Sequence, residues 1–408
     1  MSERRLRDYL LLPRPGDLVK AWIFPAAFAL GVLAAGGASG REVLRAALIW
    51  LALELLIYQA RYQWNDIRGF AADQRHPDRA ARGRLPGPPS RGRRHIRASA
   101  LVAAGRVGLA AALALALPAL DLGPALLALA VAVFGVAVVY ELLRSRATGR
   151  GDRVPAPAGA GILALWAVVG AGYAIRGVSG LAAAVDLFAE PWLLAAAVLT
   201  FWSFGIAFVT SRWALEALAF ARRDDAGELR WRVDPGQARE HTLALVRWLP
   251  TTAPSGVVRG ADGDLGNWRA LTAGGSHLAP WTVAAVVAAA AAAVTGCLLA
   301  GPASFFEAAL AAGGGAASAA AVLVAKGRRW SRLLPAGLAL AALMAVVLPR
   351  PLLATLPWLC VLAAHLFFTA QSPRTLAHPV RSVFAELRSQ RTSPPGRAPL
   401  AALARRQG

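Results

Sequence analysis

Apolar residues occur along the chain in repeated runs of about 20, and shorter polar segments separate these runs. A helix of ~20 residues spans the hydrocarbon core of a bilayer, because it rises ~1.5 Å per residue. The runs predict ten transmembrane helices, near residues 18–37, 43–60, 98–118, 124–143, 158–176, 192–212, 280–300, 304–325, 333–349 and 351–370. The predicted fold class is therefore all-α, a polytopic membrane helical bundle.

Composition supports this fold class and excludes a soluble fold, since 57% of the residues are hydrophobic and the mean hydropathy is +0.48. Arginine is concentrated in every second loop, whereas the loops between them, such as 118–124 and 301–304, are short and nearly uncharged. By the positive-inside rule the Arg-rich loops are cytoplasmic, and with ten spans both termini are cytoplasmic too. The formal net charge of +21 then reflects membrane topology, so no nucleic-acid partner is expected.

The same pattern divides the chain into a transmembrane domain, residues 1–371, and a basic, Pro-rich cytoplasmic tail, residues 372–408, which is predicted to be disordered. Two long polar segments, 61–97 and 213–279, are predicted to be cytoplasmic loops. We therefore expect an integral protein of the cytoplasmic (plasma) membrane, in contact with the lipid bilayer. The sequence does not indicate an oligomeric state.

Within the second loop, Leu243, Val246 and Leu249 form an apolar stripe at helical spacing. This stripe predicts a short amphipathic helix. Such a helix either lies on the face of the membrane or packs against the rest of the protein, and the sequence alone leaves both interpretations open.

The strongest chemical signal is the stretch WNDIRGFAADQRHPDRAARGRLPG, which begins at Trp64 where the second apolar run gives way to an Arg-rich loop. On a helix Asn65, Gly69 and Asp73 share one stripe and Asp66 lies beside it. Asp66 and Asp73 are two turns apart, about 10 Å, too far to hold one Mg²⁺ at ~2.1 Å unless the helix bends at Gly69. Such carboxylates can instead hold opposite ends of one diphosphate.

Two interpretations of these acids fit the sequence. In the first, Asn65 and Asp66 bind one Mg²⁺ together with phosphate oxygens, because Mg²⁺ prefers one or two carboxylates, phosphate oxygens and water. In the second, the acids form interfacial salt bridges with neighbouring arginines, namely Arg61, Arg68 and Arg75.

Several arginines are candidates for binding phosphate, because a guanidinium group donates two parallel hydrogen bonds to phosphate oxygens. Arg84 is the best single candidate and Arg82 the second. Arg144 and Arg146 follow the fourth apolar run, beside Tyr140. Each of these arginines also has the position expected of a charge that only sets topology.

These motifs resemble those of the UbiA superfamily of intramembrane prenyltransferases. The stretch from Trp64 is similar to that family's first aspartate motif, NDxxDxxxD followed by an Arg-Pro-Leu-Pro-Ser-Gly-like segment, with Arg84-Leu85-Pro86-Gly87 at the matching place. The segments LLLPRPGDLVKAW, YELLRSR and WAVVGAGYAIRG resemble the family's entry to the first span, its Tyr-Ser-x-x-Leu-Lys-Arg segment and its Gly-rich fifth span. The family normally has nine spans, so the last two runs are either separate helices or one helix interrupted near 349–351.

The sequence departs from the family pattern at two places. Gly69 stands where the first motif has its middle aspartate. The second motif, DxxxD, is absent from the end of the sixth run, which reads FVTSRWALE. In that segment Glu216 can supply one carboxylate. Arg212 either partly substitutes for a missing second Mg²⁺, since both neutralise diphosphate charge, or is an arginine at the membrane edge that only sets topology.

The resemblance implies transfer of a prenyl group from an isoprenyl or polyprenyl diphosphate to a small hydrophobic acceptor, aromatic or lipid, in a lipid-open helical bundle. It implies Mg²⁺ as cofactor. Relatives that transfer a phosphoribosyl group to a polyprenyl phosphate, and a non-catalytic or transporter-like protein with the same fold, remain alternatives. The resemblance assigns metal and catalytic roles to Asn65, Asp66 and Asp73 with Glu216, diphosphate binding to Arg84, Arg82, Arg144, Arg146 and Arg212, and the prenyl or acceptor pocket to Tyr140 and Tyr173.

Overall fold

Nine helical stretches of the described chain are long and apolar enough to cross a membrane. The computed structural model describes residues 5–77, 79–149, 151, 153–231, 238–252, 263–273, 277–325 and 329–377. The predicted fold class, an all-α polytopic membrane bundle, is therefore confirmed. The nine stretches are Leu6–Ala35, Gly40–Gln74, Pro89–Ala116, Gly123–Ala147, Ala160–Ala182, Pro191–Phe220, Pro280–Ala300, Phe305–Val324 and Pro351–Thr369.

The first two stretches carry most of the polar residues of the bundle. The first joins α1 (Leu6–Leu11), the 3₁₀ helix η1 (Pro15–Trp22) and α2 (Ile23–Ala35). The second is continuous through α3 (Gly40–Leu51), the π-helical η2 (Ala52–Ile57) and α4 (Tyr58–Gln74). The helix expected to end near residue 60 thus runs on to Gln74, and the polar motif lies on a helix and not in a loop.

The following helices are α5 (Arg79–Arg82), η3 (Pro89–Arg91), α6 (Gly92–Ala116), η4 (Pro118–Leu120), α7 (Gly123–Ala147), α8 (Ala160–Val168), α9 (Ala171–Ala182) and α10 (Pro191–Glu216). After η5 (Ala217–Phe220) come the antiparallel strands β1 (Ala221–Arg223) and β2 (Leu229–Trp231), then α11 (Glu240–Leu243) and η6 (Ala244–Trp248). The chain continues through α12 (Pro280–Ala300), α13 (Phe305–Val324), α14 (Arg329–Ala345), α15 (Pro351–Thr369) and α16 (Pro373–Ala377).

Local sequence explains where several helices begin. Ser39 accepts a hydrogen bond from the backbone of Glu42, whose carboxylate accepts one in return from the backbone of Ser39 at 2.7 Å, so a capping box begins α3. Ser304 and Glu307 make the same pair at the start of α13. Proline occupies the first position of α10, α12 and α15, where its missing N–H costs no hydrogen bond.

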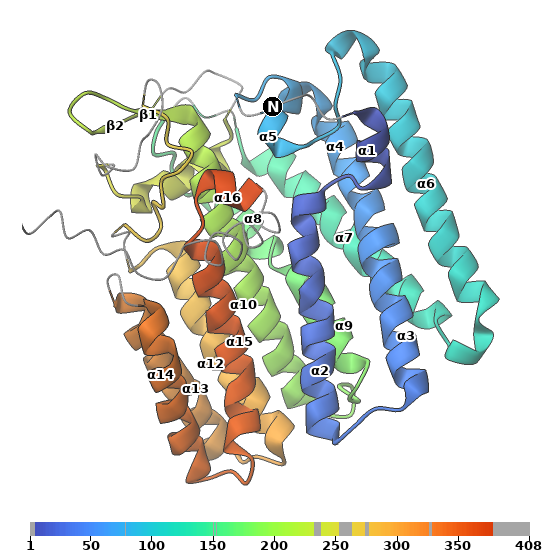
Figure 1. The fold of residues 1–408 in the computed structure, drawn as a ribbon, viewed down its shortest axis with the longest axis vertical. Coiled ribbons are helices and arrows are strands. Elements are labelled where there is room, and N and C mark those ends of the chain that lie inside the picture. Colours follow the sequence, from blue (N-terminus) through green and yellow to red (C-terminus); the bar gives the residue numbers. More distant parts are fainter. Residues whose placement is uncertain are drawn as a thin grey trace, which may run out of the picture.

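The polar connections gather at one end of the bundle, which we term the polar end. Figure 1 shows α1, α5, the β1–β2 hairpin and α16 at that end, whereas the α2–α3 connection lies at the opposite end. Both ends of the described chain are therefore on the same side. This arrangement agrees with the alternation of Arg-rich and uncharged loops in the sequence.

Small residues allow close packing among α10, α12, α13 and α15, which form one side of the bundle (Figure 1). The buried face of α12 is mostly alanine, and a Cβ added at Gly296 would lie 1.9 Å from the carbonyl oxygen of Ala354 in α15. Gly180 of α9 meets the backbone of Phe24 in α2 in the same way, at 2.2 Å. In a bilayer, where apolar side chains gain little from leaving lipid, such close backbone contacts are a main source of helix association.

The predicted span 333–349 corresponds to α14, which packs against α13 and α15 (Figure 1). Its 17 described residues, about 26 Å in length, are at the lower end of the ~17–25 residues that cross a bilayer core. A tenth crossing by this helix agrees with the two described ends lying on the same side. Pro351 begins α15 as a separate helix, so the last two apolar runs are two helices and not one interrupted span.

The described parts of segment 213–279 form a small packed cap at the polar end. Leu243, Val246 and Leu249 are all buried, in one apolar cluster with Trp166 of α8 and Trp268. The stripe therefore packs against the rest of the protein and does not lie on the face of the membrane. In the predicted tail, Pro373–Ala377 is helical and Arg374 pairs with Asp264 of the cap; residues 378–408 lie outside the described residues.

A buried histidine lies within this cap. The side chain of His241 is 5% exposed and packs on Trp213 with 4.6 Å between ring centres. Its Nδ1 has no hydrogen-bond partner in the described chain. Burial, together with the nearby Arg144 and Arg239, lowers the pKa of His241 to about 3. The imidazole is therefore neutral in the folded protein at neutral pH.

We expect Gly296→Leu to destabilise the bundle, because its side chain would overlap the backbone of α15. Overpacking of this kind costs about 1–3 kcal/mol. Thermal unfolding in detergent measures the loss. Gly135→Ala in α7 is the matched control: Gly135 is exposed and has no atom within 4 Å of an added Cβ, so this variant should unfold at or slightly above the wild-type temperature. Equal losses in both variants would contradict the α12–α15 contact.

Acid should destabilise the protein partly through His241. In the unfolded chain His241 takes up a proton near the ordinary histidine pKa of ~6.5, whereas in the folded protein its imidazole stays neutral down to about pH 3. The free energy of unfolding therefore decreases as the pH falls between these two values. At a pH of ~5 the loss is about 2 kcal/mol. His241→Phe keeps a ring and removes the titration. Its unfolding temperature should fall less than that of the wild type between about pH 7 and pH 5; equal falls would contradict the assignment.

Candidate functional site

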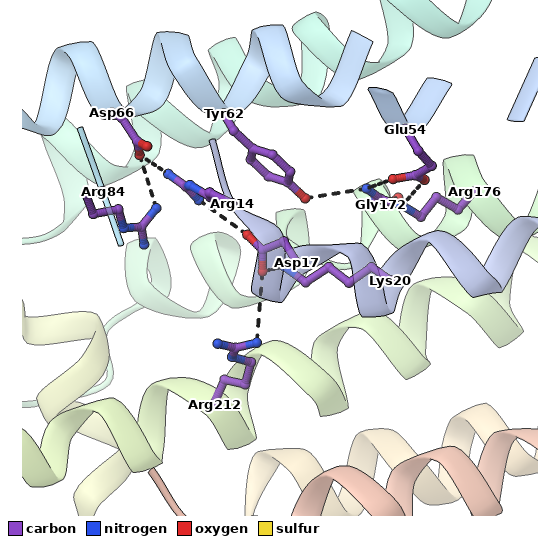
Figure 2. A network of polar contacts seen from close by, with 10 residues as sticks. All are labelled: Arg14, Asp17, Lys20, Glu54, Tyr62, Asp66, Arg84, Gly172, Arg176 and Arg212. Carbon is purple, nitrogen blue, oxygen red and sulfur yellow. Dashed lines mark hydrogen bonds and ion pairs between the residues drawn. The ribbon is translucent and has the colours of Figure 1, made fainter. Parts of the chain in front are cut away.

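Asp66 is the centre of a buried ion-pair network at the polar end (Figure 2). It lies on the buried face of α4, one turn from Tyr62 and from Phe70, and is fully buried. Its Oδ1 accepts hydrogen bonds from Arg14 and, at 3.2 Å, from Nη1 of Arg84. Its Oδ2 accepts one from the hydroxyl of Tyr9 at 3.2 Å. Both carboxylate oxygens thus have donors from other parts of the chain.

Arg14 links this carboxylate to a second one. Its Nη1 lies 3.8 Å from Oδ2 of Asp17, whose Oδ1 lies 2.8 Å from Nζ of Lys20 and 3.9 Å from Nη1 of Arg212. Figure 2 shows Arg14 between Asp66 and Asp17, with Arg212 reaching Asp17 from α10. The carboxylates of Asp66 and Asp17 therefore connect three segments of the chain: the segment from Arg14 into η1, the helix α4 and the helix α10.

Local sequence accounts for the position of Arg14. The helical region is disfavoured for a residue before proline, and Arg14 is non-helical, with φ −132° and ψ 78°, between α1 and η1. Pro15 then begins η1, and Asp17 lies in its first turn, where a carboxylate interacts favourably with the helix dipole. The break in the first span thus places a cation and a carboxylate side by side.

A second part of the network surrounds Asp73. Arg82 of α5 lies 3.5 Å from Oδ1 of Asp73. Glu216, at the end of α10, interacts electrostatically with Arg82, Arg212 and Arg84. Burial and the neighbouring charge of Arg84 lower the pKa of Arg82, which still remains a cation because arginine titrates far above neutral pH.

The third part connects α4 to α7 through Glu141. The side-chain amide of Asn65, oriented to satisfy its partners, donates to Glu141 at 3.0 Å, and its carbonyl oxygen accepts from Arg14 at 2.5 Å. Glu141 also pairs with Arg144 at 2.7 Å and with Arg68 at 3.2 Å. Asn65 therefore joins the Asp66 network to the basic end of α7.

Several guanidinium donors in this network have no acceptor. We define the arginine cluster as Arg14, Arg82, Arg84 and Arg212, whose side chains are 12 to 24% exposed. In the described chain the Nε groups of Arg14, Arg82 and Arg84, and Nη1 of Arg212, are buried without a hydrogen-bond partner. An unpaired buried donor is costly, so these groups are candidate hydrogen-bond donors for an anion.

Aromatic rings lie against the cluster. We define the aromatic layer as Tyr62, Tyr173, Phe204, Phe208 and Phe368, in which Tyr173 contacts Phe208 at 5.4 Å and Phe208 contacts Phe368 at 4.6 Å between ring centres. Arg14 lies 4.8 Å from the centre of the Tyr62 ring, and Lys20 and Arg212 each lie 5.7 Å from that of Phe208. The hydroxyl of Tyr173 is buried without a partner in the described residues.

A separate ion pair lies deeper in the bundle. Arg176 of α9 binds both carboxylate oxygens of Glu54, at 2.6 and 3.0 Å, and both residues are buried. Glu54 is in the π-helical η2. Arg176 also lies 3.3 Å from the ring centre of Tyr58 and donates to the Tyr62 hydroxyl at 3.4 Å (Figure 2). Tyr62 therefore contacts both this pair and Arg14.

Most of the residues predicted from the sequence come together in the network. The exceptions are Arg146, which is exposed and makes no ion pair in the described chain, and Tyr140, which lies outside the aromatic layer and faces Arg61 and Arg144. Helix α4 passes through Gly69 without a break. The residues brought together are Asn65, Asp66, Asp73, Arg82, Arg84, Arg144, Arg212 and Glu216, with Tyr173 in the aromatic layer.

Asp66 and Asp73 form salt bridges, as the second interpretation predicted, but their partners are not the arginines that were expected. Arg68 pairs with Glu141, and Arg75 donates to the backbone of Ala71. Sequence reasoning missed Arg14, the central cation, and Asp17, the second carboxylate with which Arg14 pairs. Lys20, Tyr9 and Glu141 were missed too, and Glu141 stands out as the acid near the end of an otherwise uncharged run.

The residues of this site do not fit a resident Mg²⁺ ion. Across the described ranges no group of three or more His, Cys, Asp or Glu residues could hold a metal ion. Asp66, the carboxylate expected to bind the metal, already accepts hydrogen bonds from two guanidinium groups and a phenol. The magnesium expectation therefore stays a prediction that the geometry does not support.

Fold and site together define a class, a polytopic all-α membrane protein with a buried, arginine-rich ion-pair network at one end. In comparisons with protein-family models, curated proteins and solved structures, nothing matches this chain.

We expect Arg14→Met to destabilise the protein strongly, because it leaves the buried carboxylate of Asp66 with one cation fewer. Removing one partner of a buried ion pair costs about 3–5 kcal/mol. Arg146→Met is the matched control, since Arg146 is exposed, and should change stability by less than about 0.5 kcal/mol. Unfolding in detergent measures both. Adding Asp66→Asn to Arg14→Met should recover part of the loss, and strictly additive effects would argue against the pairing.

Proposed function

We propose that this protein is an integral membrane transferase that moves a prenyl group from an isoprenyl or polyprenyl diphosphate to a small hydrophobic acceptor, aromatic or lipid. The observation that carries the proposal is the arginine cluster, whose buried N–H groups without hydrogen-bond partners come from three segments of the chain at the polar end. The likeness of residues 64–87 to the UbiA superfamily motif supports it and belongs to the same proposal.

The headgroup of such a donor suits the arginine cluster. A diphosphate offers many acceptor oxygens and several negative charges, and guanidinium groups bind phosphate oxygens in pairs. The cluster lies at one end of helices that cross the membrane, so a lipid diphosphate would bring its headgroup to the arginines while its chain stays among apolar residues. Asp66 and Asp73 then act as positioning residues, because each holds one or more of the arginines in place.

In the proposed reaction, negative charge develops on the departing diphosphate and positive charge on the prenyl group. The bond between the prenyl C1 and the bridging oxygen breaks, and the diphosphate leaves with the electron pair. Guanidinium groups fixed in advance stabilise that leaving charge. The allylic carbon, now electron-deficient, is attacked by the acceptor, which loses a proton. Rings of the aromatic layer face cations already and suit an allylic cation by cation–π attraction.

The proposal includes the orientation of the protein. The positive-inside rule places the arginine-rich polar end in the cytoplasm, where soluble diphosphate precursors and phosphate products are found. Both ends of the described chain lie at that polar end (Figure 1). The protein would thus be part of the cytoplasmic (plasma) membrane, with both chain ends on the cytoplasmic side.

Calorimetric titration of the detergent-purified protein with geranyl, farnesyl and geranylgeranyl diphosphates tests the binding step. Farnesol, which lacks the diphosphate, is the control ligand. Binding of a diphosphate but not of farnesol, followed by transfer to one of a panel of phenolic and lipid acceptors, would support the proposal. Binding without transfer to any acceptor would favour a non-catalytic protein of the same fold, and absence of binding would refute the proposal.

Arg84→Gln should weaken diphosphate binding by about 10 to 100-fold, since a charge-assisted hydrogen bond contributes ~1.5–3 kcal/mol. Arg84→Lys keeps the charge but not the paired donors, so its affinity should lie between those of the wild type and Arg84→Gln. The exposed Arg146→Gln is the control and should bind like the wild type. Gel filtration and circular dichroism check that each variant is folded. Equal affinities in all four proteins would remove Arg84 from the site.

A further inference from the structure

Every carboxylate at the proposed diphosphate site already has a basic partner. Asp66 pairs with Arg14 and Arg84, and Asp73 pairs with Arg82. The same holds for Asp17, which pairs with Lys20, Arg14 and Arg212. At Asp66 and Asp17 basic or hydroxyl groups lie beside both carboxylate oxygens, and at Asp73 a guanidinium group lies beside Oδ1, so these groups occupy positions that a metal ion would need.

The coordination that Mg²⁺ requires is not compatible with these paired carboxylates. The ion takes six oxygen ligands at ~2.0–2.1 Å in octahedral geometry and gives up its water reluctantly. A protein site for it therefore needs carboxylate oxygens that face one open point. Asp66 is fully buried, and donors reach both of its oxygens from three segments. No cluster of metal-binding groups exists in the part of the chain that the structure describes.

The charge balance points to an anion as the ligand. The four arginines of the cluster and Lys20 face the carboxylates of Asp17, Asp66, Asp73 and Glu216, so one positive charge remains. The four buried N–H groups without acceptors add directional hydrogen-bonding capacity to that excess charge. Arg212 and Glu216 lie one turn apart on α10 and therefore on the same face of that helix. Of these two neighbouring side chains, one is a cation and the other a carboxylate.

We propose that the arginine cluster binds the diphosphate of the donor lipid directly, with guanidinium groups in place of divalent metal ions. This inference rests on the proposed function, since it specifies how the same headgroup is held. The Nε groups of Arg14, Arg82 and Arg84 donate to the phosphate oxygens, and Arg212 contributes its Nη1, which makes no hydrogen bond in the described chain. Asp66 and Asp73 keep their ion pairs with these arginines and do not contact the phosphate.

Titration of farnesyl diphosphate into the full-length protein, once with excess Mg²⁺ and once with excess EDTA after metal removal, tests this. We expect the two dissociation constants to agree within about threefold. Loss of binding in EDTA by more than about tenfold would overturn the inference while leaving the proposed function intact. Absence of binding under both conditions would refute the proposed function itself, so the two failures are distinguishable.

Gly69→Asp provides a gain-of-function comparison. Gly69 lies on α4 between Asn65 and Asp73, and an added Cβ would meet only the flexible end of Asp73, at 3.1 Å. A third carboxylate there creates a group of acids that can recruit a metal, so this variant should bind farnesyl diphosphate more tightly, by about tenfold, with Mg²⁺ than with EDTA. Gly69→Asn has the same shape without the charge and should remain insensitive to Mg²⁺. A wild type that responds to Mg²⁺ as strongly as Gly69→Asp would overturn the inference.

Discussion

The ion pairs of Arg14 are the interaction on which the polar end depends. A buried carboxylate in a membrane protein is costly unless a cation and hydrogen-bond donors compensate it. Arg14 compensates two, Asp66 on α4 and Asp17 on η1, while its backbone lies in the break between α1 and η1. The first span, the second span and, through Asp17, α10 are thereby fixed to one another, and the other arginines are arranged around this centre.

The long second span carries this network along the helix axis. Glu54, Tyr58, Tyr62 and Asp66 recur every four residues from η2 into α4, so they line one side of a single continuous helix. Arg176 pairs with the first of these residues and Arg14 with the last, and the Tyr62 side chain contacts both cations. The π-helical turn at Glu54 is of the kind often found at functional sites. The two ion pairs are therefore connected through the side chain of Tyr62.

Sequence patterns predicted the helices and at least one member of several ion pairs, but neither member of the Arg14–Asp17 and Glu54–Arg176 pairs. Apolar runs identified the membrane bundle, and helical spacing placed Asn65, Asp66 and Asp73 together because that relation is local. Partners could not be predicted in this way, since Arg14 is 52 residues from Asp66 and Arg176 is 122 residues from Glu54. Such pairs depend on how helices pack, which small residues such as Gly296 decide through backbone contacts that leave no periodic signal. The packed stripe of Leu243 was ambiguous for the same reason.

The chemistry of arginine suits the proposed site, in which guanidinium groups hold an anion without a metal. The cluster contains four arginines, and the one lysine beside it, Lys20, lies on Asp17 with its ammonium group 2.8 Å from the carboxylate. A guanidinium group stays charged when buried, is weakly hydrated and keeps donors free after it has paired with a carboxylate, whereas an ammonium group is more strongly hydrated and titrates more readily on burial. Arginine can therefore serve two carboxylates or a carboxylate and a phosphate at once. A network of this kind can be structurally complete before the ligand arrives and still offer the ligand directed hydrogen bonds, which is the condition for a binding site that needs no further ion to assemble it.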